Sequence, residues 1–236
     1  KGYMINFMLI AQEGEVLINP PEKLIRENLQ KLEPVNGHRA PSVTENGAIE
    51  SFLKEGAWKG RRCFIIGGGP SLKGFDFSRL KGELVIGVNR AFEQIDPAII
   101  FSIDSRFHMW VRSGNFGPGV YEKFLASQSQ RVWLDTHGYQ FGPGITSIPV
   151  IRATSPGTNR KLGDNFTGGL PHYGNSGLAA LNLAIILGAD PIYLLGFDMN
   201  KDGRFQKWWH DGYPSIQRDD VYEGFRNEFE LVAPDI

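Results

Sequence analysis

Three consecutive glycines follow a short apolar stretch and mark the clearest candidate for a ligand-binding turn. The stretch Cys63–Ile66 has the composition of a buried strand, and Gly67-Gly68-Gly69-Pro70-Ser71 follows it directly. Glycine suits a backbone that needs φ > 0 or a very close approach. Turns of this kind in open α/β sheets bind phosphate groups through backbone N–H groups. We therefore predict that Gly67, Gly68, Gly69 and Ser71 bind a nucleotide or sugar phosphate; a tight strand–helix turn without a ligand is the alternative.

The turn matches neither of two well-known phosphate-binding loops. A dinucleotide fingerprint that begins at Gly67 requires glycine at position 72, which is Leu72 here. A Walker A loop requires Gly-Lys-Ser/Thr, which Leu72-Lys73-Gly74 does not supply. Pro70 fixes φ and removes a donor N–H, so this turn is stiffer than either loop. The hydroxyl of Ser71 can cap a following helix or bind a ligand.

An aromatic segment, Trp208-Trp209-His210-Asp211-Gly212-Tyr213, is the candidate for catalysis. Two adjacent tryptophans in a glycine-rich loop suit a lid over a flat or sugar-like ligand better than a core. A histidine titrates near neutral pH and can take a proton from an acceptor hydroxyl. We predict His210 as the catalytic residue, with a surface histidine as the alternative. The predicted lid residues that contact the substrate are Trp208, Trp209 and Tyr213.

Two predicted strands end in polar residues that suit a nucleotide. Asn89 follows residues 84–88, and its carboxamide can read a base or ribose edge; a helix cap is the alternative. Asp104 follows residues 99–103 and can hold a ribose hydroxyl or a metal, while Arg106 can face phosphate or substrate. A salt-bridged pair on a loop is the alternative for these two residues. Because loops after parallel strands meet in one crevice, we expect all three side chains near the glycine turn.

Two more predicted nucleotide-binding segments lie further along the chain. Asn175 and Ser176 begin an apolar helix, whose N-terminal end and free N–H groups favour an anion. Gly196 and Asp198 follow the core strand 191–195, where a ribose-binding or catalytic carboxylate is expected.

The elements that must position these residues alternate between strand and helix from Arg61 onward. The expected strands are 63–66, 84–88, 99–103, 132–134 and 191–195, and the expected helices are 75–80, 90–94, 120–128 and 176–187. Such alternation favours a mostly parallel sheet with right-handed crossovers. The predicted class is α/β, a Rossmann-like open sheet with helices on both faces, a small N-terminal appendage and a lid loop.

The predicted division of the chain is an appendage and linker at 1–60 and a nucleotide-binding catalytic domain at 61–236. The appendage contains an apolar strand at the start, a helix over 22–32, a linker-like stretch over 33–46 and a short helix over 48–55. A polar, glycine-rich loop covers 154–174. Residues 232–236 have the composition of a chain entering another strand, which indicates a truncated C-terminal element.

Composition narrows the function classes. The 236 residues are 41% hydrophobic and 22% charged with a net charge of −1, which is typical of a soluble globular protein and gives no strong nucleic-acid signal. Cys63 is alone, and no zinc-type spacing of Cys and His exists, so no metal site is predicted. No stretch reaches the roughly 20 apolar residues of a membrane span. We expect a cytoplasmic protein, and a homo-oligomer is compatible with the sequence.

Two groups of motifs resemble known families. Ile65–Leu72 with Phe75–Leu80, and later Gly174–Gly177 with Ile192–Asp198, resemble the bacterial sialyltransferases of the Campylobacter lipooligosaccharide type. They equally resemble the MptE-like (DUF115) family, which includes archaeal hydroxymethylpterin diphosphokinases and motility accessory factors that glycosylate flagellin. The resemblance covers about residues 61–212. Asp104, in Phe101-Ser102-Ile103-Asp104, is closer to the MptE-like pattern.

The sialyltransferase resemblance implies a CMP-sugar donor. It would place CMP phosphate and ribose near Gly68, Gly69, Ser71 and Ser176, Asn89 at the nucleotide, Asp198 near the base or ribose, and His210 as the base. The expected function is thus inverting transfer from a nucleotide sugar to a glycan or protein hydroxyl, with no required cofactor. One alternative is a pterin-type diphosphokinase with Mg²⁺-ATP, whose metal Asp104 and Asp198 would hold. The other is a non-catalytic nucleotide-binding module.

Overall fold

The apolar runs expected to be strands form the middle of a parallel sheet in the computed structural model, which describes residues 10–12, 15–17, 53–135, 138–151, 162–199, 208–215 and 221–235. The sheet contains nine described strands in the order β2-β1-β9-β3-β4-β5-β6-β7-β8, of which the seven from β9 to β8 are parallel. Their bounds are β1 Ile10–Gln12, β2 Glu15–Leu17, β3 Cys63–Ile66, β4 Leu84–Val88, β5 Ile99–Ser102, β6 Gln130–Asp135, β7 Thr146–Ile151, β8 Leu170–Pro171 and β9 Ile192–Leu195.

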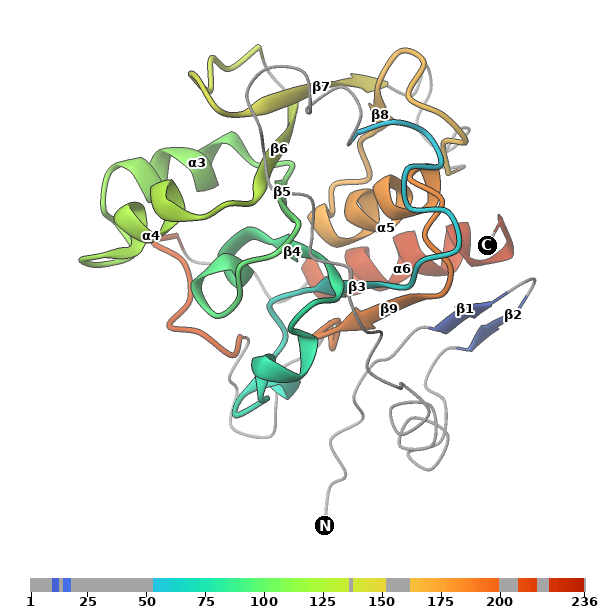
Figure 1. Cartoon of the computed structure of the whole chain (residues 1–236), viewed down its shortest axis with the longest axis horizontal. Coiled ribbons are helices and arrows are strands. Elements are labelled where there is room, and N and C mark those ends of the chain that lie inside the picture. Colours follow the sequence, from blue (N-terminus) through green and yellow to red (C-terminus); the bar gives the residue numbers. More distant parts are fainter. Residues whose placement is uncertain are drawn as a thin grey trace.

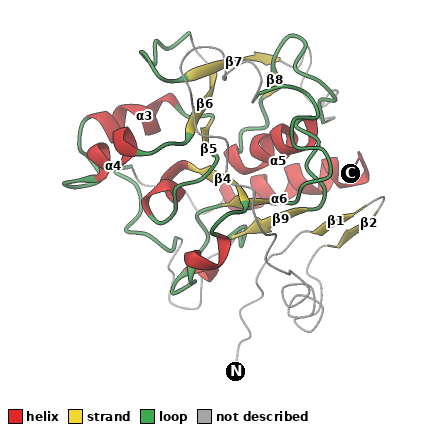
Figure 2. Ribbon diagram, in the orientation of Figure 1, coloured by secondary structure: helices red, strands yellow, loops and turns green. Residues whose placement is uncertain are grey.

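Helices cover both faces of this sheet, which confirms the predicted α/β class (Figure 1; Figure 2). The α-helices are α3 Ser105–Arg112, α4 Val120–Ala126, α5 Ser176–Ile186 and α6 Val221–Val232, and the 3₁₀ turns are η1 Pro70–Leu72, η2 Phe77–Leu80, η3 Asn89–Glu93 and η4 Ala233–Asp235. Alternate strand residues face opposite sides. Cys63 and Ile65 pack with α5 and α6, whereas Phe64 and Ile66 pack with η1 and η2.

The face opposite α5 is continued by α3 and α4, which pack on the strands through aromatic rings. Phe107 of α3 stacks on Trp133 of β6, and Phe124 of α4 meets the same indole edge-on. Fully buried strands need apolar residues on both faces, which explains why β3, β4 and β5 are almost continuously apolar.

Helix α5 is buried along its length because its sequence offers almost no polar face. Its one interior polar side chain, Asn182, donates to the Gly163 carbonyl and accepts from the Gly163 N–H and the Tyr173 hydroxyl. A buried amide costs little when its hydrogen bonds are made. Gly188, at φ +81°, ends the helix in a left-handed conformation that glycine adopts without strain.

Part of the predicted appendage extends the sheet. Strand β1 pairs antiparallel with β9 and with β2 at the sheet edge. Trp58, also before the predicted boundary, is buried in the main core, and its N–H donates to the Leu187 carbonyl. The expected helix over 22–32 and the linker over 33–46 lie outside the described residues, as do residues 154–161 of the loop over 154–174.

Several elements were not predicted, and some predictions were wrong. Strands β2, β7 and β8, helices α3 and α6 and the turns η1 and η4 were not expected, and the 3₁₀ turns η2 and η3 replace two expected helices. Residues 232–236 were expected to enter a strand, but the chain ends α6 at Val232 and continues as the turn η4. Val232 packs into the core as the last member of an apolar helical face that includes Tyr222, Phe225 and Phe229.

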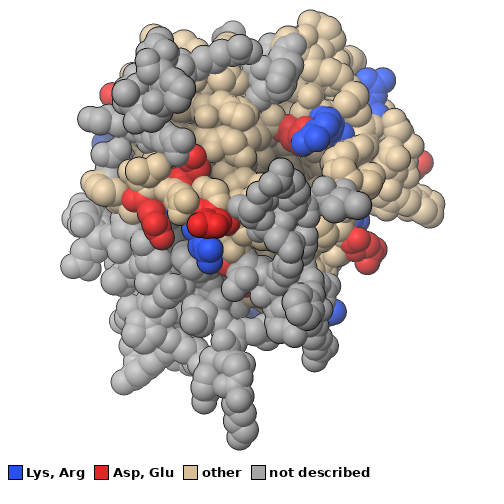
Figure 3. All heavy atoms as spheres, turned by 180° about the vertical axis from the view of Figure 1, so that it is seen from behind, with Lys and Arg blue, Asp and Glu red and all other residues tan. Residues whose placement is uncertain are grey.

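One face of the molecule carries mixed charges. On the face shown in Figure 3, acidic and basic side chains of the described residues lie next to each other rather than in a patch of one sign. None of the described helices combines the length and the apolar composition that crossing a membrane requires.

A buried histidine on α3 makes stability depend on pH. His108 is 2% exposed, its Nδ1 has no hydrogen-bond partner among the described residues, and its ring meets Phe124, Trp133, Tyr139 and Phe141. Burial, and secondarily the charge of Arg112, lowers its pKa to about 4. Below the unfolded value of 6.5, the unfolded chain therefore binds a proton that the folded chain excludes.

We expect this histidine to remove about 2 kcal/mol of stability between pH 7 and pH 5. Urea unfolding of the wild type and of His108→Phe at both pH values measures this effect, because the variant cannot take up the proton. Between pH 7 and pH 5, the free energy of unfolding should fall by about 2 kcal/mol less in the variant than in the wild type. An equal loss in both proteins would show that His108 is not held neutral.

Candidate functional site

The carboxyl ends of β3, β4, β5 and β9 surround one cavity of about 1020 Å³. The N-termini of α3 and α5 reach the same place, as expected where helices run antiparallel to the strands. Eleven predicted site residues line it: Gly67, Gly68, Gly69, Asn89, Asp104, Arg106, Asn175, Ser176, Gly196, Trp208 and Tyr213. Four do not, namely Ser71, Asp198, Trp209 and His210.

The glycine turn is locked against the turn that follows β9. The N–H of Gly67 donates to the Leu195 carbonyl at 2.8 Å, and the N–H of Gly69 donates to the Gly196 carbonyl at 2.7 Å. A Cβ at position 67 would lie 2.7 Å from the Gly196 oxygen, and one at position 69 only 1.8 Å from Asp198 Oδ2. Two of the three glycines are thus required by backbone packing, whether or not a ligand binds.

Gly68 lines the cavity together with Gly67 and Gly69, but its N–H is not used to bond the two turns. No described residue accepts its N–H, whereas its carbonyl accepts the N–H of Trp209 at 3.1 Å. A Cβ at this position would meet only Trp208 and His210, at 3.4 and 3.5 Å. Of the three amides predicted to bind a phosphate, that of Gly68 is thus the one left available for a ligand by the described residues.

Asp198 holds the two turns together. Its Oδ2 accepts a 2.7 Å hydrogen bond from the Ser71 hydroxyl. Partial burial raises the pKa of this carboxyl, and the hydrogen bond from Ser71 offsets part of that effect. Ser71 and Asp198 were predicted to bind the nucleotide, but the structure commits them to each other, outside the cavity wall.

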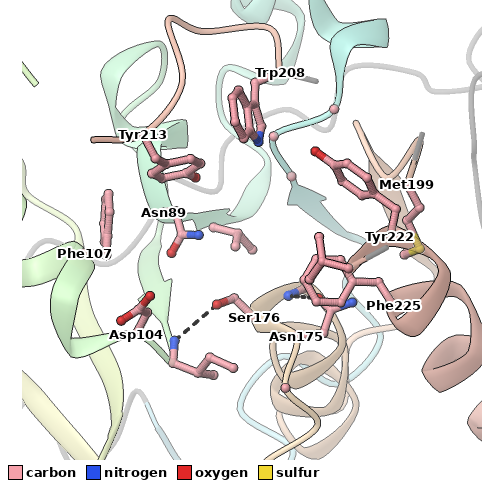
Figure 4. Close-up of a pocket in the computed structure, with 18 of the residues that line it drawn as sticks. Asn89, Asp104, Phe107, Asn175, Ser176, Met199, Trp208, Tyr213, Tyr222 and Phe225 are labelled. Carbon is pink, nitrogen blue, oxygen red and sulfur yellow. Dashed lines mark hydrogen bonds between the residues drawn. The ribbon is translucent and has the colours of Figure 1, made fainter. Parts of the chain in front are cut away.

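The floor of the cavity is built from capped helix ends (Figure 4). Asn175 Oδ1 accepts the N–H groups of Gly177 and Leu178 at the start of α5. The hydroxyl of Ser176 accepts the N–H of Ile103, which joins α5 to the end of β5. The side chains expected to hold an anion at this helix end thus also close it structurally.

Asp104 caps α3 and pairs with Arg106. Its Oδ1 accepts the Arg106 N–H at 2.8 Å, and the guanidinium donates to both carboxylate oxygens, at 3.2 and 3.0 Å. The ion pair considered as the alternative at this site is therefore present. The Arg106 guanidinium also lies 5.8 Å from the Trp110 ring centre.

Asn89 combines a left-handed backbone with a buried, unpaired oxygen. Its φ is +52°, a conformation that asparagine tolerates better than most residues. Its Oδ1 is buried and has no hydrogen-bond partner among the described residues. Burial raises the pKa of the neighbouring Tyr213 hydroxyl, while a hydrogen bond from Asn89 opposes the rise. An unpaired buried acceptor is costly, which makes Asn89 a candidate for ligand contact.

The segment 208–215, expected to be a lid, is tied to the glycine turn. Trp209 donates from its N–H to the Gly68 carbonyl and from its indole Nε1 to the Gly67 carbonyl at 3.0 Å. The buried Arg90 donates to the Gly212 carbonyl at 2.6 Å and pairs with Glu93. In this structure the segment forms a wall of the cavity, with Trp208 and Tyr213 lining it.

The surroundings of His210 argue against its predicted role as a base. Its Nδ1 accepts the Gly212 N–H at 3.0 Å, so the proton of a neutral ring resides on Nε2. That Nε2 is buried without a hydrogen-bond partner among the described residues. Burial, with the nearby charge of Arg90, lowers the pKa to about 3. The ring packs against Trp208, Trp209 and Tyr213, where it supports the wall.

The opposing walls of the cavity are aromatic and were largely missed from sequence. Phe107 and Trp110 come from α3, and Tyr222 and Phe225 come from α6. Figure 4 shows Phe107 on the side of the cavity opposite Tyr222 and Phe225. The apolar spacing of α6 could have been recognised as one helical face. Its approach to the cavity depends on tertiary packing that no local signal shows.

No cluster of three or more potential metal-ligating side chains occurs in the described part of the chain. Asp104 is paired with Arg106 and Asp198 with Ser71, so neither carboxylate is unengaged. Compared with models of known protein families, with curated proteins and with solved structures, the chain shows no significant match.

Proposed function

We propose that this chain is a glycosyltransferase that binds a nucleotide sugar and transfers the sugar to a glycan or protein hydroxyl. The resemblance to sialyltransferases favours a CMP-linked sugar as the donor. The observation that carries the proposal is the cavity at the carboxyl edge of the parallel sheet, with a polar floor between aromatic walls. Ligands of open α/β sheets bind outside the carboxyl ends of the strands.

The polar and aromatic parts of the cavity suit different parts of such a donor. The Gly68 N–H suits a phosphate oxygen, and the unpaired Asn89 Oδ1 suits an N–H or O–H donor of a base or ribose. The rings of Phe107, Trp110 and Trp208 suit a flat base or the apolar face of a sugar. At about 1020 Å³, the cavity is at the upper end of small-molecule sites and has room for a donor with part of an acceptor.

The engaged carboxylates favour this proposal over the diphosphokinase. That reaction needs Mg²⁺ held by carboxylates at the transferring phosphates. The Arg106 cation beside Asp104 disfavours a second cation there, and Asp198 bonds to Ser71 and is not among the residues that line the cavity. No lysine is among the described residues that line the cavity.

Calorimetric titration of CMP, UDP, GDP and ATP, each with and without Mg²⁺, tests the proposal. We expect CMP to bind without metal at micromolar concentration, about −8 kcal/mol, and Gly68→Ala to weaken it because the new methyl group lies against the cavity. Gly224→Ala is the control, since Gly224 does not have a left-handed φ, is not among the residues that line the cavity, and has nothing within 4 Å of an added Cβ. Mg²⁺-dependent ATP binding would favour the diphosphokinase, and absence of any binding would favour the non-catalytic module.

A further inference from the structure

We propose that Asp104, oriented by Arg106, is the catalytic base that takes the proton of the acceptor hydroxyl. The inference rests on the glycosyltransferase proposal and deepens it. It replaces the sequence-based prediction of His210 in that role.

Asp104 is the only carboxylate among the described residues that line the cavity. Its side chain is 32% exposed, in contrast to the buried Nε2 of His210. Figure 4 shows the carboxylate directed into the space bounded by Phe107, Asn89 and Ser176. A base must come within hydrogen-bond reach of the proton that it removes, and an acceptor in the cavity can approach the partly exposed Asp104 carboxylate without movement of the wall.

The backbone of Asp104 is held on both sides. Its N–H donates to Ser102 Oγ at 3.0 Å, and its carbonyl accepts the Trp133 indole N–H at 3.2 Å. Both anchors are buried side chains of the central strands β5 and β6. A catalytic group needs such support because small displacements reduce the rate strongly.

Arg106 fixes the plane of the carboxylate but does not use all of its acceptor capacity. The guanidinium donates from Nε to Oδ1 and from Nη2 to Oδ2. A carboxylate has about four lone-pair sites, and Oδ1 also receives the Arg106 N–H, so Oδ2 retains a lone pair for an acceptor hydroxyl. Arg106 is thus a positioning residue, and its side chain, 65% exposed, lies at the cavity mouth.

The proposed step is an inverting displacement. The acceptor oxygen forms a bond to the anomeric carbon of the donor, while the bond from that carbon to the phosphate oxygen breaks and the nucleotide leaves with the electron pair. The hydroxyl proton passes to the Asp104 carboxylate. In the absence of an acceptor, water takes the place of the hydroxyl, so hydrolysis of the donor reports the same base.

The test compares CMP affinity with hydrolysis of CMP-N-acetylneuraminate in Asp104→Asn and Asp104→Ser. Both variants keep an oxygen that can cap α3, and thermal unfolding confirms that each is folded. We expect CMP affinity within about threefold of wild type and a fall in kcat of at least about 100-fold. The matched control is Asp76→Asn, which changes an exposed capping aspartate of η2 outside the cavity and should retain wild-type kcat.

Two further variants separate the roles of the neighbours. Arg106→Gln keeps the carboxylate and removes its orientation, so we expect a fall in kcat of about tenfold with unchanged CMP affinity. His210→Asn keeps an acceptor for the Gly212 N–H and should lower kcat less than Asp104→Asn does.

The outcomes distinguish this inference from the function on which it rests. Failure of the wild type to bind CMP contradicts the proposed function and the base together. CMP binding without hydrolysis of the donor leaves nucleotide binding in place and overturns the base. Asp104→Asn also overturns it if kcat stays within threefold of wild type, or if CMP affinity falls as much as kcat.

Discussion

Gly69→Ala is expected to destabilise the fold by about 3 kcal/mol or more, among the largest effects of a single methyl group in this protein. The new Cβ would lie 1.8 Å from Asp198 Oδ2 and 2.6 Å from the Gly196 carbonyl oxygen. The backbone oxygen belongs to the turn after β9, which is hydrogen-bonded to the glycine turn and cannot withdraw alone. Urea unfolding of both proteins at pH 7 measures the loss.

Gly68→Ala provides the matched comparison at the adjacent position. Its Cβ comes no closer than 3.4 Å to another group, so we expect stability within about 0.5 kcal/mol of wild type. The two alanine variants should therefore differ in the property that they change. Gly69→Ala should lower the free energy of unfolding, whereas Gly68→Ala should lower the affinity for CMP. Equal stability of the two variants would contradict the close packing of the two turns.

Arg90→Met is expected to cost about 3 kcal/mol and to loosen the segment 208–215. The substitution removes the cation from Glu93, whose side chain is only 13% exposed, and the donor from the Gly212 carbonyl. Breaking a buried ion pair on one side leaves an uncompensated charge. Chemical denaturation measures the free energy of unfolding. Hydrogen exchange at the Trp209 N–H, which bonds to the Gly68 carbonyl, measures how often the segment 208–215 detaches from the glycine turn.

The control for Arg90 is Arg62→Met, which breaks the pair of Arg62 with Glu83 away from the cavity. Both side chains of that pair are 15% exposed, so some cost in stability is expected there too. Exchange at Trp209 should increase in the Arg90 variant and stay at the wild-type rate in the Arg62 variant. Similar exchange in all three proteins would show that Arg90 does not hold the wall in place.

The central strands could be predicted because buried parallel strands are nearly continuous apolar runs in the sequence. Cys63–Ile66 and Leu84–Val88 are apolar on both faces, and a polar or glycine residue follows each at the sheet edge. Since parallel strands end on the same side, the location of the candidate site followed from the strands alone. This is why eleven residues chosen from sequence line one cavity.

The individual roles could not be predicted, because they depend on partners far away in sequence. Ser71 and Asp198 both looked like ligand-binding residues, and only the fold shows that they bind each other. His210 has the right chemistry for a base. Its Nδ1 is engaged by Gly212 and its Nε2 is buried, which the order of residues does not reveal. The aromatic walls from α3 and α6 arise in the same way from tertiary packing.

The position of β9 beside β3 has a consequence for how the protein folds during synthesis. The first strand of the parallel set pairs on one side with the last, and the Ser71–Asp198 hydrogen bond spans 127 residues. Until Ile192–Leu195 leaves the ribosome, one edge of β3 has no strand to pair with. Pairing of such long range is slow, and an open apolar edge can recruit other chains. We therefore expect the cavity at the carboxyl edge of the sheet to form last, so that nascent chains that stop before β9 aggregate rather than complete this edge.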